Sequence, residues 1–423
     1  MCQQIRQFPK FLGAQLLRIC AAILVGTILL TLFCMIPSAS MDDNLAASAS
    51  VFQEEGVYPD LFSWCNSKLD STTDALILMI SAFDSTQAPL VHAMSGTYHT
   101  LSSEEIISNA LVAHYGAGIP FDGSTPYYHY WHGYQLIIRP LLSVFDYSGI
   151  RILNAVFQVA VLLLLCILLC RNRLHRYILP LVVSILMLMP VALAMSLQFS
   201  PCYYIMMLGS IVLLIKKEQM HRISGILFLY IGIATAYFDF LTYPVVTLGI
   251  PAVLYFVMCS DCDFRNTFCR GVKICFSWGM GYGLMWAGKW LIGSLILQKN
   301  ILSVASDNFV ERSSANSNLV KNLRAALGAN IKHFLYTPAT AVLFLLAGIL
   351  LLLLVIRLLS KKITLPQVLA VFFPFVILAV IPFAWYAVSS QHALVHYWFT
   401  NKCLMLSVFA GLCALTKATQ KHT

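Results

Sequence analysis

Long apolar runs with few charges constrain this chain more than any other feature. The first covers residues 11–36, which is long enough to cross a bilayer and longer than the apolar core of a signal peptide. Nine more runs lie near residues 150–170, 177–196, 201–215, 223–239, 241–258, 274–293, 338–358, 366–388 and 398–415. Hydrophobic residues make up 59% of the 423 residues and charged residues only 11%, so the bilayer must act as the solvent for much of the chain. We therefore expect an all-α polytopic membrane protein with about ten transmembrane helices.

The placement of charge predicts the orientation of these helices. Arg6 and Lys10 precede the first run and Arg18 lies in its first third, and every segment expected on the same side is also basic. Only three carboxylates share those segments, namely Glu218, Asp261 and Asp263. Because short cytoplasmic loops are rich in Lys and Arg, both termini are expected to be cytoplasmic, in a multi-pass protein of the plasma membrane. The net charge of +9 then reflects orientation, and nucleic acid is not an expected partner.

This topology divides the chain into five parts. Residues 1–36 hold the N-terminus and first helix, and residues 37–148 form a long extracytoplasmic loop with short helices expected at 74–82 and 102–114. Residues 149–293 hold helices two to seven. Residues 294–337 form a second extracytoplasmic loop, and residues 338–423 hold the last three helices and a cytoplasmic tail.

Two adjacent acids, Asp42 and Asp43, follow the first membrane helix directly. Carboxylates at a membrane surface can act as a general base or bind a divalent ion. The same residues also favour a helix N-terminus, so they could serve only to cap the short helix expected after them.

The stretch that contains these acids, DDNLAASASVFQEEGVYP (42–59), resembles the first outer loop of the glycosyltransferase C superfamily. Its members are multi-span enzymes that use polyprenyl-phosphate sugars, with an acid pair early in that loop. A second stretch, HGYQLIIRPLLSVFDYSGIRILNAVFQ (132–158), is similar to the family's aromatic and proline-containing approach to the next membrane helix. The two motifs, the long loop and the topology cover about a third of the chain. The first loop is longer than many members need.

The resemblance implies transfer of a sugar from a polyprenyl-phosphate donor to a glycan or glycolipid acceptor of the cell envelope on the outer face. Asp42 or Asp43 would take the proton of the acceptor hydroxyl, or hold a divalent metal ion if the enzyme uses one. A transporter or flippase for a lipid-linked saccharide would explain the outer residues equally well, and a polysaccharide polymerase would use the same face. Sequence motifs typical of P-loop ATPases, HExxH metalloproteases and GxSxG hydrolases are absent.

Cations, histidines and one further acid near the outer face are candidates for binding the lipid phosphate or the sugar. They are Arg139, Lys402, His129, His132, His392, His396 and Asp239. Arg151, Arg324 and Lys332 also lie near outer helix ends, where the positive-inside rule disfavours them. Arginine can contact phosphate through two N–H groups and lysine through a point charge. For each residue the alternative is ordinary packing, or a long side chain reaching the headgroups.

Three cysteines fall in one predicted cytoplasmic loop, Cys259, Cys262 and Cys269. A closed zinc site needs four ligands, so reduced thiols are the favoured interpretation. No other cysteine spacing predicts a disulfide framework.

Overall fold

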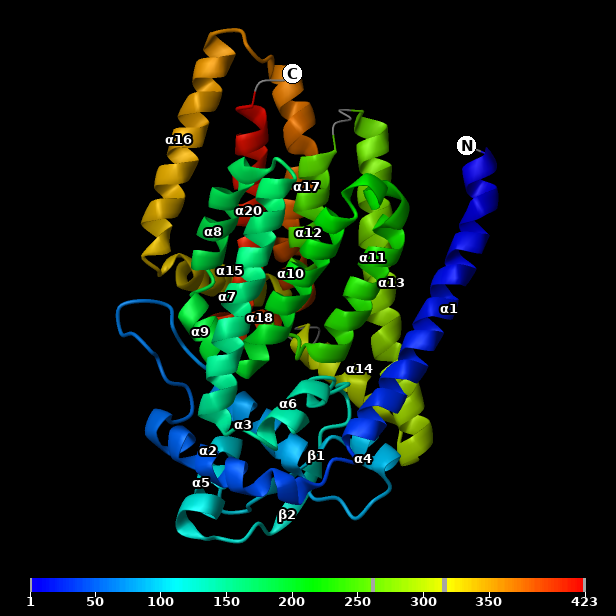
Figure 1. Ribbon diagram of the computed structural model, residues 1–423, viewed down its shortest axis with the longest axis vertical. Helices are drawn as coiled ribbons and strands as arrows, with labels where there is room; N and C mark the ends of the chain where they lie inside the picture. The colour runs from blue at the N-terminus through cyan, green and yellow to red at the C-terminus, as the bar shows by residue number, and fades with distance from the viewer. Residues whose placement is uncertain (1, 260–262, 314–317, 421–423) are drawn as a thin grey trace.

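The computed structural model describes residues 2–259, 263–313 and 318–420. Within these ranges the chain is predominantly helical, and its only sheet has two short antiparallel strands. Long helices form a bundle above a smaller lobe, which consists of elements between α1 and α7 (Figure 1). The expected all-α class is confirmed.

Seven helical segments in the described ranges are long and apolar enough to cross a membrane. They are Pro9–Phe33 in α1 (Cys2–Phe33), Tyr147–Arg171 (α7), Leu197–Ile215 with η3 (Leu197–Phe199) and α10 (Ser200–Ile215), Lys217–Phe238 with η4 (Lys217–Gln219) and α11 (Met220–Phe238), Ala339–Leu359 (α16), Leu365–Val388 (α17), and Tyr397–Ala418 with α19 (Tyr397–Thr400), η5 (Asn401–Leu404) and α20 (Met405–Ala418). These segments support assignment to the membrane.

The predicted total of ten spans is not confirmed, although each of the other three predicted spans contains a helix. The helices are α8 (Ile178–Leu186), α12 (Val245–Met258) and the 34-residue α13 (Phe264–Leu297). The predicted span 177–196 is interrupted after η2 (His175–Tyr177) and α8, because Met189 has a φ of 55° and a new helix, α9 (Pro190–Met195), begins at Pro190. Proline has no N–H to continue a helical ladder, so it begins α9 instead.

The segment predicted as the first outer loop folds into the smaller lobe. Its elements are η1 (Ser38–Ser40), α2 (Asp42–Glu55), α3 (Ser71–Ala82), α4 (Pro89–Ser95), β1 (Thr97–Thr100), α5 (Ile107–Ala117), β2 (Gly123–Pro126) and α6 (Gln135–Leu142). Strands β1 and β2 pair with Thr97 opposite Pro126. The helix expected at 74–82 is present, but the one expected from Ser102 begins only at Ile107. Ser102 donates its backbone N–H and its hydroxyl to Asp122 instead of capping a helix.

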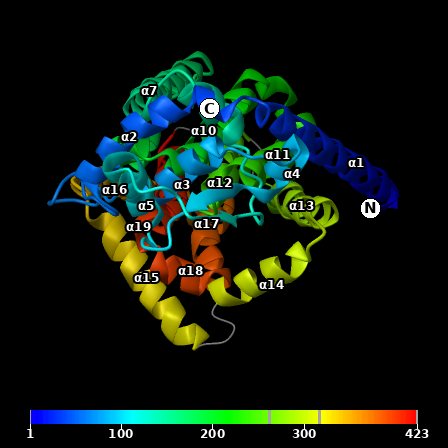
Figure 2. The same cartoon turned by 90° about the horizontal axis from the view of Figure 1, so that it is seen from below.

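The second predicted outer segment contributes α14 (Ile301–Arg312) and α15 (Leu319–Leu335). Seen from the lobe side, these helices lie at the edge of the bundle, next to α18 (Ser390–Val395) (Figure 2). Asn330 of α15 donates to the carbonyl of Ala393 at 2.8 Å and accepts from the hydroxyl of Thr400 at 2.8 Å. These bonds attach α15 to the segment between α17 and α20.

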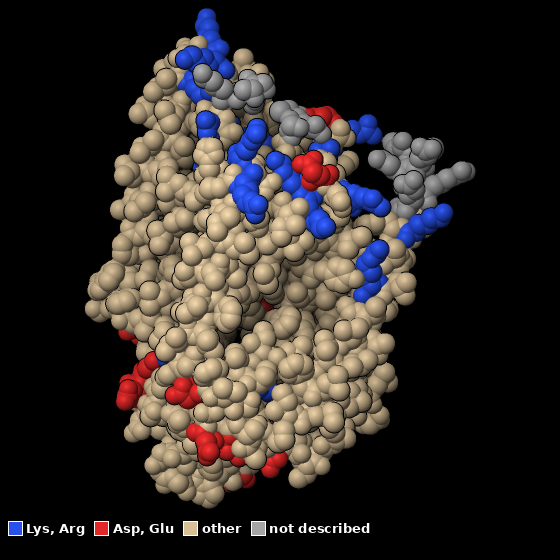
Figure 3. Space-filling model, in the orientation of Figure 1, with Lys and Arg blue, Asp and Glu red and all other residues tan. Residues whose placement is uncertain are grey.

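The two ends of the molecule differ in charge. On the face shown in Figure 3, Lys and Arg gather at one end, which is the end where both termini lie in Figure 1. On that face the few charged residues of the lobe at the opposite end are mainly Asp and Glu. This separation agrees with the charge alternation read from the sequence.

Helices α11 and α13 approach each other closely through two glycines. A methyl group on Gly232 would overlap the carbonyl oxygen of Trp278, and one on Gly281 would overlap that of Leu229. Small residues at such crossings let the backbones of membrane helices come into contact. The crossing therefore depends on the absence of a Cβ atom at both positions.

We predict that Gly281→Ala lowers the free energy of unfolding by about 1–3 kcal/mol, because the added methyl must displace a backbone carbonyl. Gly279→Ala on the same helix is the matched control, since its new Cβ would meet nothing within 4 Å. The measurement is thermal unfolding of the purified protein in detergent. Equal melting temperatures for the two variants would contradict the close crossing.

Candidate functional site

Asp42 and Asp43 occupy the first turn of α2, a short connection away from α1. Both side chains are exposed, and the N-terminal end of a helix favours negative charge. Partial burial raises the pKa of Asp42, and the carboxylates of Asp84 and Asp43 add to this effect. The pair is thus accessible to water, with one acid whose affinity for a proton is increased by its neighbours.

A cavity of about 500 Å³ opens near this turn, between residues 34–39 and the loop that precedes α4. Asp84 and Arg139 line it, whereas Asp42 and Asp43 do not. Arg139 is 1% exposed and donates to the carbonyls of Ser81 at 2.5 Å, of Cys34 at 3.4 Å and of Ile36. Its terminal nitrogens therefore hold the connection between α1 and α2 in place.

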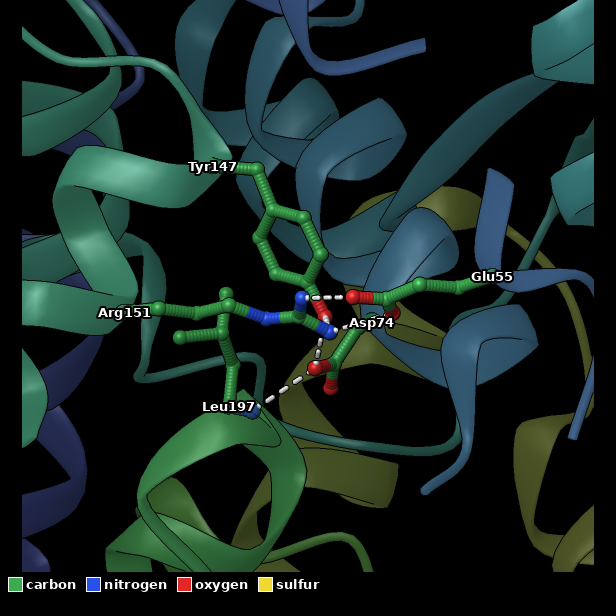
Figure 4. Close-up of polar contacts among 5 residues, drawn as sticks. All are labelled: Glu55, Asp74, Tyr147, Arg151 and Leu197. Carbon is green, nitrogen blue, oxygen red and sulfur yellow. Dashed lines mark hydrogen bonds and ion pairs between the residues drawn. The ribbon is translucent and has the colours of Figure 1, made fainter. Parts of the chain in front are cut away.

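A buried polar network attaches α2 to the start of α7 (Figure 4). Arg151 forms two parallel bonds with Glu55, Nη1 to Oε1 at 2.5 Å and Nη2 to Oε2 at 2.9 Å. The same Nη2 atom donates to the hydroxyl of Tyr147 at 2.7 Å. The two stretches that carry the family resemblance, 42–59 and 132–158, are thus in direct contact through a side-chain pair.

Asp74 of α3 extends this network to the start of α10. Its carboxylate accepts from the Tyr147 hydroxyl at 2.5 Å and from the backbone N–H groups of Leu197 at 2.8 Å and Gln198 at 3.0 Å. Burial raises the pKa of Asp74 to about 6, although these donors and Arg151 act in the opposite direction. The network fixes the lobe against two membrane helices.

A second cavity, of about 370 Å³, lies where both predicted outer segments meet the bundle. His129 reaches it from the first outer segment, and Phe309 and Arg312 reach it from α14. Aromatic side chains of α13 and α17 supply much of its wall, namely Tyr282, Trp286, Trp290 and Trp385. The Trp290 indole N–H donates to the carbonyl of His129 at 3.1 Å and holds that loop against α13. We call this space the aromatic cavity.

Of the four histidines predicted on the outer face, His129 lines the aromatic cavity, and His392 and His396 lie next to its wall. His392 donates from Nε2 to the carbonyl of Leu241, a residue that lines the cavity, and its ring centroid lies 4.8 Å from that of His396. Asp239 fixes the same turn by accepting from the backbone N–H and the hydroxyl of Thr242. Asp239 therefore supports the wall of the cavity.

Burial, with a contribution from Arg312, lowers the pKa of each of these histidines. The pKa falls to about 4 for His129 and His396 and to about 3 for His392. The three imidazoles are therefore uncharged at neutral pH and can offer hydrogen bonds but no positive charge. Arg312 supplies the positive charge of the aromatic cavity, with its guanidinium 5.7 Å from the ring centroid of Tyr130.

Sequence reasoning did not select Arg312. It lies in ERSSANS (311–317), a polar stretch that looks like an ordinary loop. Two features of the sequence could have indicated a binding role for Arg312. Phe309 lies three residues earlier, and the segment is expected on the outer side, where the positive-inside rule disfavours an arginine.

Two other predicted residues, His132 and Lys402, are each 2% exposed and bond within the protein. His132 pairs through Nε2 with the carbonyl of Tyr127 at 2.6 Å and through Nδ1 with the hydroxyl of Tyr134 at 3.1 Å. Lys402 donates to the carbonyl of Trp398 at 3.4 Å and lies 4.6 Å from the ring centroid of Phe199. Their observed bonds are those of packed side chains.

Among the described residues, no three His, Cys, Asp or Glu side chains form a group that could hold a metal ion. Of the cysteine trio, Cys262 lies outside the described residues. Comparison of the chain with models of known families, with curated proteins and with solved structures gives no match.

We predict that Arg151→Met lowers the free energy of unfolding by about 3 kcal/mol, because it leaves the buried Asp74 and the partly buried Glu55 without their cation. The matched control is Lys68→Met, which breaks the exposed pair with Asp60 at 4.0 Å and should cost less than about 1 kcal/mol. Chemical or thermal unfolding in detergent measures both. A loss for Arg151→Met no larger than that for the control would contradict the role given to the network.

Proposed function

We propose that the chain is a membrane glycosyltransferase that moves a sugar from a polyprenyl-phosphate donor to a cell-envelope acceptor on the outer face. The observation that supports this most is the aromatic cavity, where an apolar wall and one arginine lie together at the meeting of both outer segments. Apolar aromatic walls suit an isoprenoid chain, and a guanidinium suits the phosphate at its end.

In this proposal Asp42 or Asp43 accepts the proton of an acceptor hydroxyl. The hydroxyl oxygen then bonds to the anomeric carbon of the donor sugar while the bond from that carbon to the phosphate oxygen breaks. The departing polyprenyl phosphate keeps the electron pair, and Arg312 stabilises its charge. The uncharged imidazoles of His129 and His396 add hydrogen bonds to the phosphate or the sugar.

Segment 127–134 lies between the aromatic cavity and the cavity that Asp84 and Arg139 line. His129 lines the aromatic cavity, while His132 is close enough to His92 of the other cavity for His92 to contribute to the lowering of the His132 pKa. A donor whose phosphate sits at Arg312 would extend its sugar along this segment toward α2.

The basic end that carries both termini would face the cytoplasm, and the lobe would face outward, in a plasma membrane (Figure 3). This orientation puts the acids and both cavities on the side where envelope glycans are assembled.

We predict that Asp42→Asn and Asp43→Asn together abolish sugar transfer while leaving donor binding unchanged, because amides cannot accept the proton. The assay follows transfer from a polyprenyl-phosphate sugar by purified protein in nanodiscs. Full transfer by the double variant would contradict the catalytic role. Donor binding by the wild type without any transfer would indicate a transporter or flippase instead.

We predict that Arg312→Gln weakens binding of polyprenyl phosphate by roughly 10- to 100-fold, the loss that follows when a charge-assisted hydrogen bond is removed. Arg324→Gln on α15 removes an exposed outer arginine and is the matched control. Binding is measured by displacement of a fluorescent prenyl phosphate. An equal loss in the two variants would show that only surface charge matters.

A further inference from the structure

The cavity near Asp42 contains buried polar groups that the proposed reaction does not use. Residues 34–39 form one wall, Phe83, Asp84, Ser85 and Gln87 form another, and His92 of α4 and Arg139 of α6 lie at its buried side. We call this space the His92 cavity. At about 500 Å³ it falls within the range of small-molecule sites.

His92 is the most informative residue of this cavity. Its side chain is 3% exposed, yet neither ring nitrogen has a hydrogen-bond partner among the described residues. The Nε atom of Arg139, in a side chain that is 1% exposed, also lacks one. Burying a polar group without a hydrogen bond costs about 1–3 kcal/mol, so such groups in a native fold point to a partner from outside the chain.

The chemistry of the lining narrows that partner. Burial, with Arg139 contributing, lowers the pKa of His92 to about 4, so at neutral pH its ring offers one donor and one acceptor. Arg139 adds a donor and Asp84 an acceptor, while Ser38 and Ser85 can do either. Asp84 and nearby Asp42 would repel an anion, and Arg139 would repel a cation. An uncharged ligand with several hydroxyl groups satisfies the whole set.

We propose that the His92 cavity binds a saccharide unit through its hydroxyl groups, and that this unit belongs to the acceptor. The assignment to the acceptor rests on the proposed function, in which Asp42 is a candidate base. Asp42 does not line the cavity, but it interacts electrostatically with the lining residue Asp84. Binding of a saccharide does not rest on it, and can be measured without any transfer reaction.

The test measures binding of a panel of methyl glycosides, and of inorganic phosphate, to the full-length protein in nanodiscs by ligand-observed NMR. Ala39→Trp fills the cavity from an exposed lining position, and Ala47→Trp places the same side chain at an exposed position of α2 that does not line it. His92→Phe removes both ring nitrogens and keeps a planar ring. At least one glycoside should bind to the wild type, Ala39→Trp and His92→Phe should weaken it tenfold or more, and Ala47→Trp should leave it unchanged.

Several results would overturn the inference: no glycoside binds, phosphate binds in their place, or Ala39→Trp and Ala47→Trp behave alike. Arg312→Gln distinguishes this proposal from the proposed function. It should weaken binding of polyprenyl phosphate at the aromatic cavity and leave glycoside binding at the His92 cavity intact. Glycoside binding in a protein that shows no sugar transfer would contradict the glycosyltransferase proposal and support a saccharide-binding site. Normal sugar transfer by Ala39→Trp would contradict the assignment of the bound saccharide to the acceptor.

Discussion

The pair between the buried Arg151 and the partly buried Glu55 is the interaction on which the rest of the arrangement depends. It joins the end of α2 to the start of α7 at 2.5 and 2.9 Å, and Tyr147 and Asp74 carry the connection onward to the start of α10. Taking these charges out of water is costly, and their bidentate geometry offsets much of that cost. Because α2 is fixed at its C-terminal end, the position of the acids at its N-terminal end is fixed as well.

The lobe end of the molecule separates the charges that the proposed reaction uses. Asp42 interacts electrostatically with Asp84, which lines the polar His92 cavity, whereas Arg312 lies in the apolar aromatic cavity together with the uncharged imidazole of His129. In the proposed reaction the first group handles a polar acceptor and the second handles an amphipathic donor. An apolar wall with a single arginine favours a ligand that is apolar along its length and anionic at one end, as a polyprenyl phosphate is.

The sequence predicted the helices well, because a run of apolar residues specifies a buried or lipid-facing helix by itself. It predicted spans less well: Pro190 divides one run, and α12 is shorter than its run suggested. For the site, the acids and the His392–His396 pair were visible as local patterns. The partner of Arg151 was not, since Glu55 lies 96 residues away and only the fold brings them together. Arg312 was missed for the same reason, because its polar surroundings in the sequence become aromatic ones only after folding.

The proposed reaction requires the aromatic cavity to hold the phosphate end of a polyprenyl lipid. An electron cryo-microscopy structure of the protein in nanodiscs supplied with a polyprenyl phosphate would show whether it does. We expect density for the isoprenoid chain against Trp286 and Trp290, with the phosphate in contact with the guanidinium of Arg312. Lipid density seated on another part of the surface, with Arg312 contacting only protein, would contradict it.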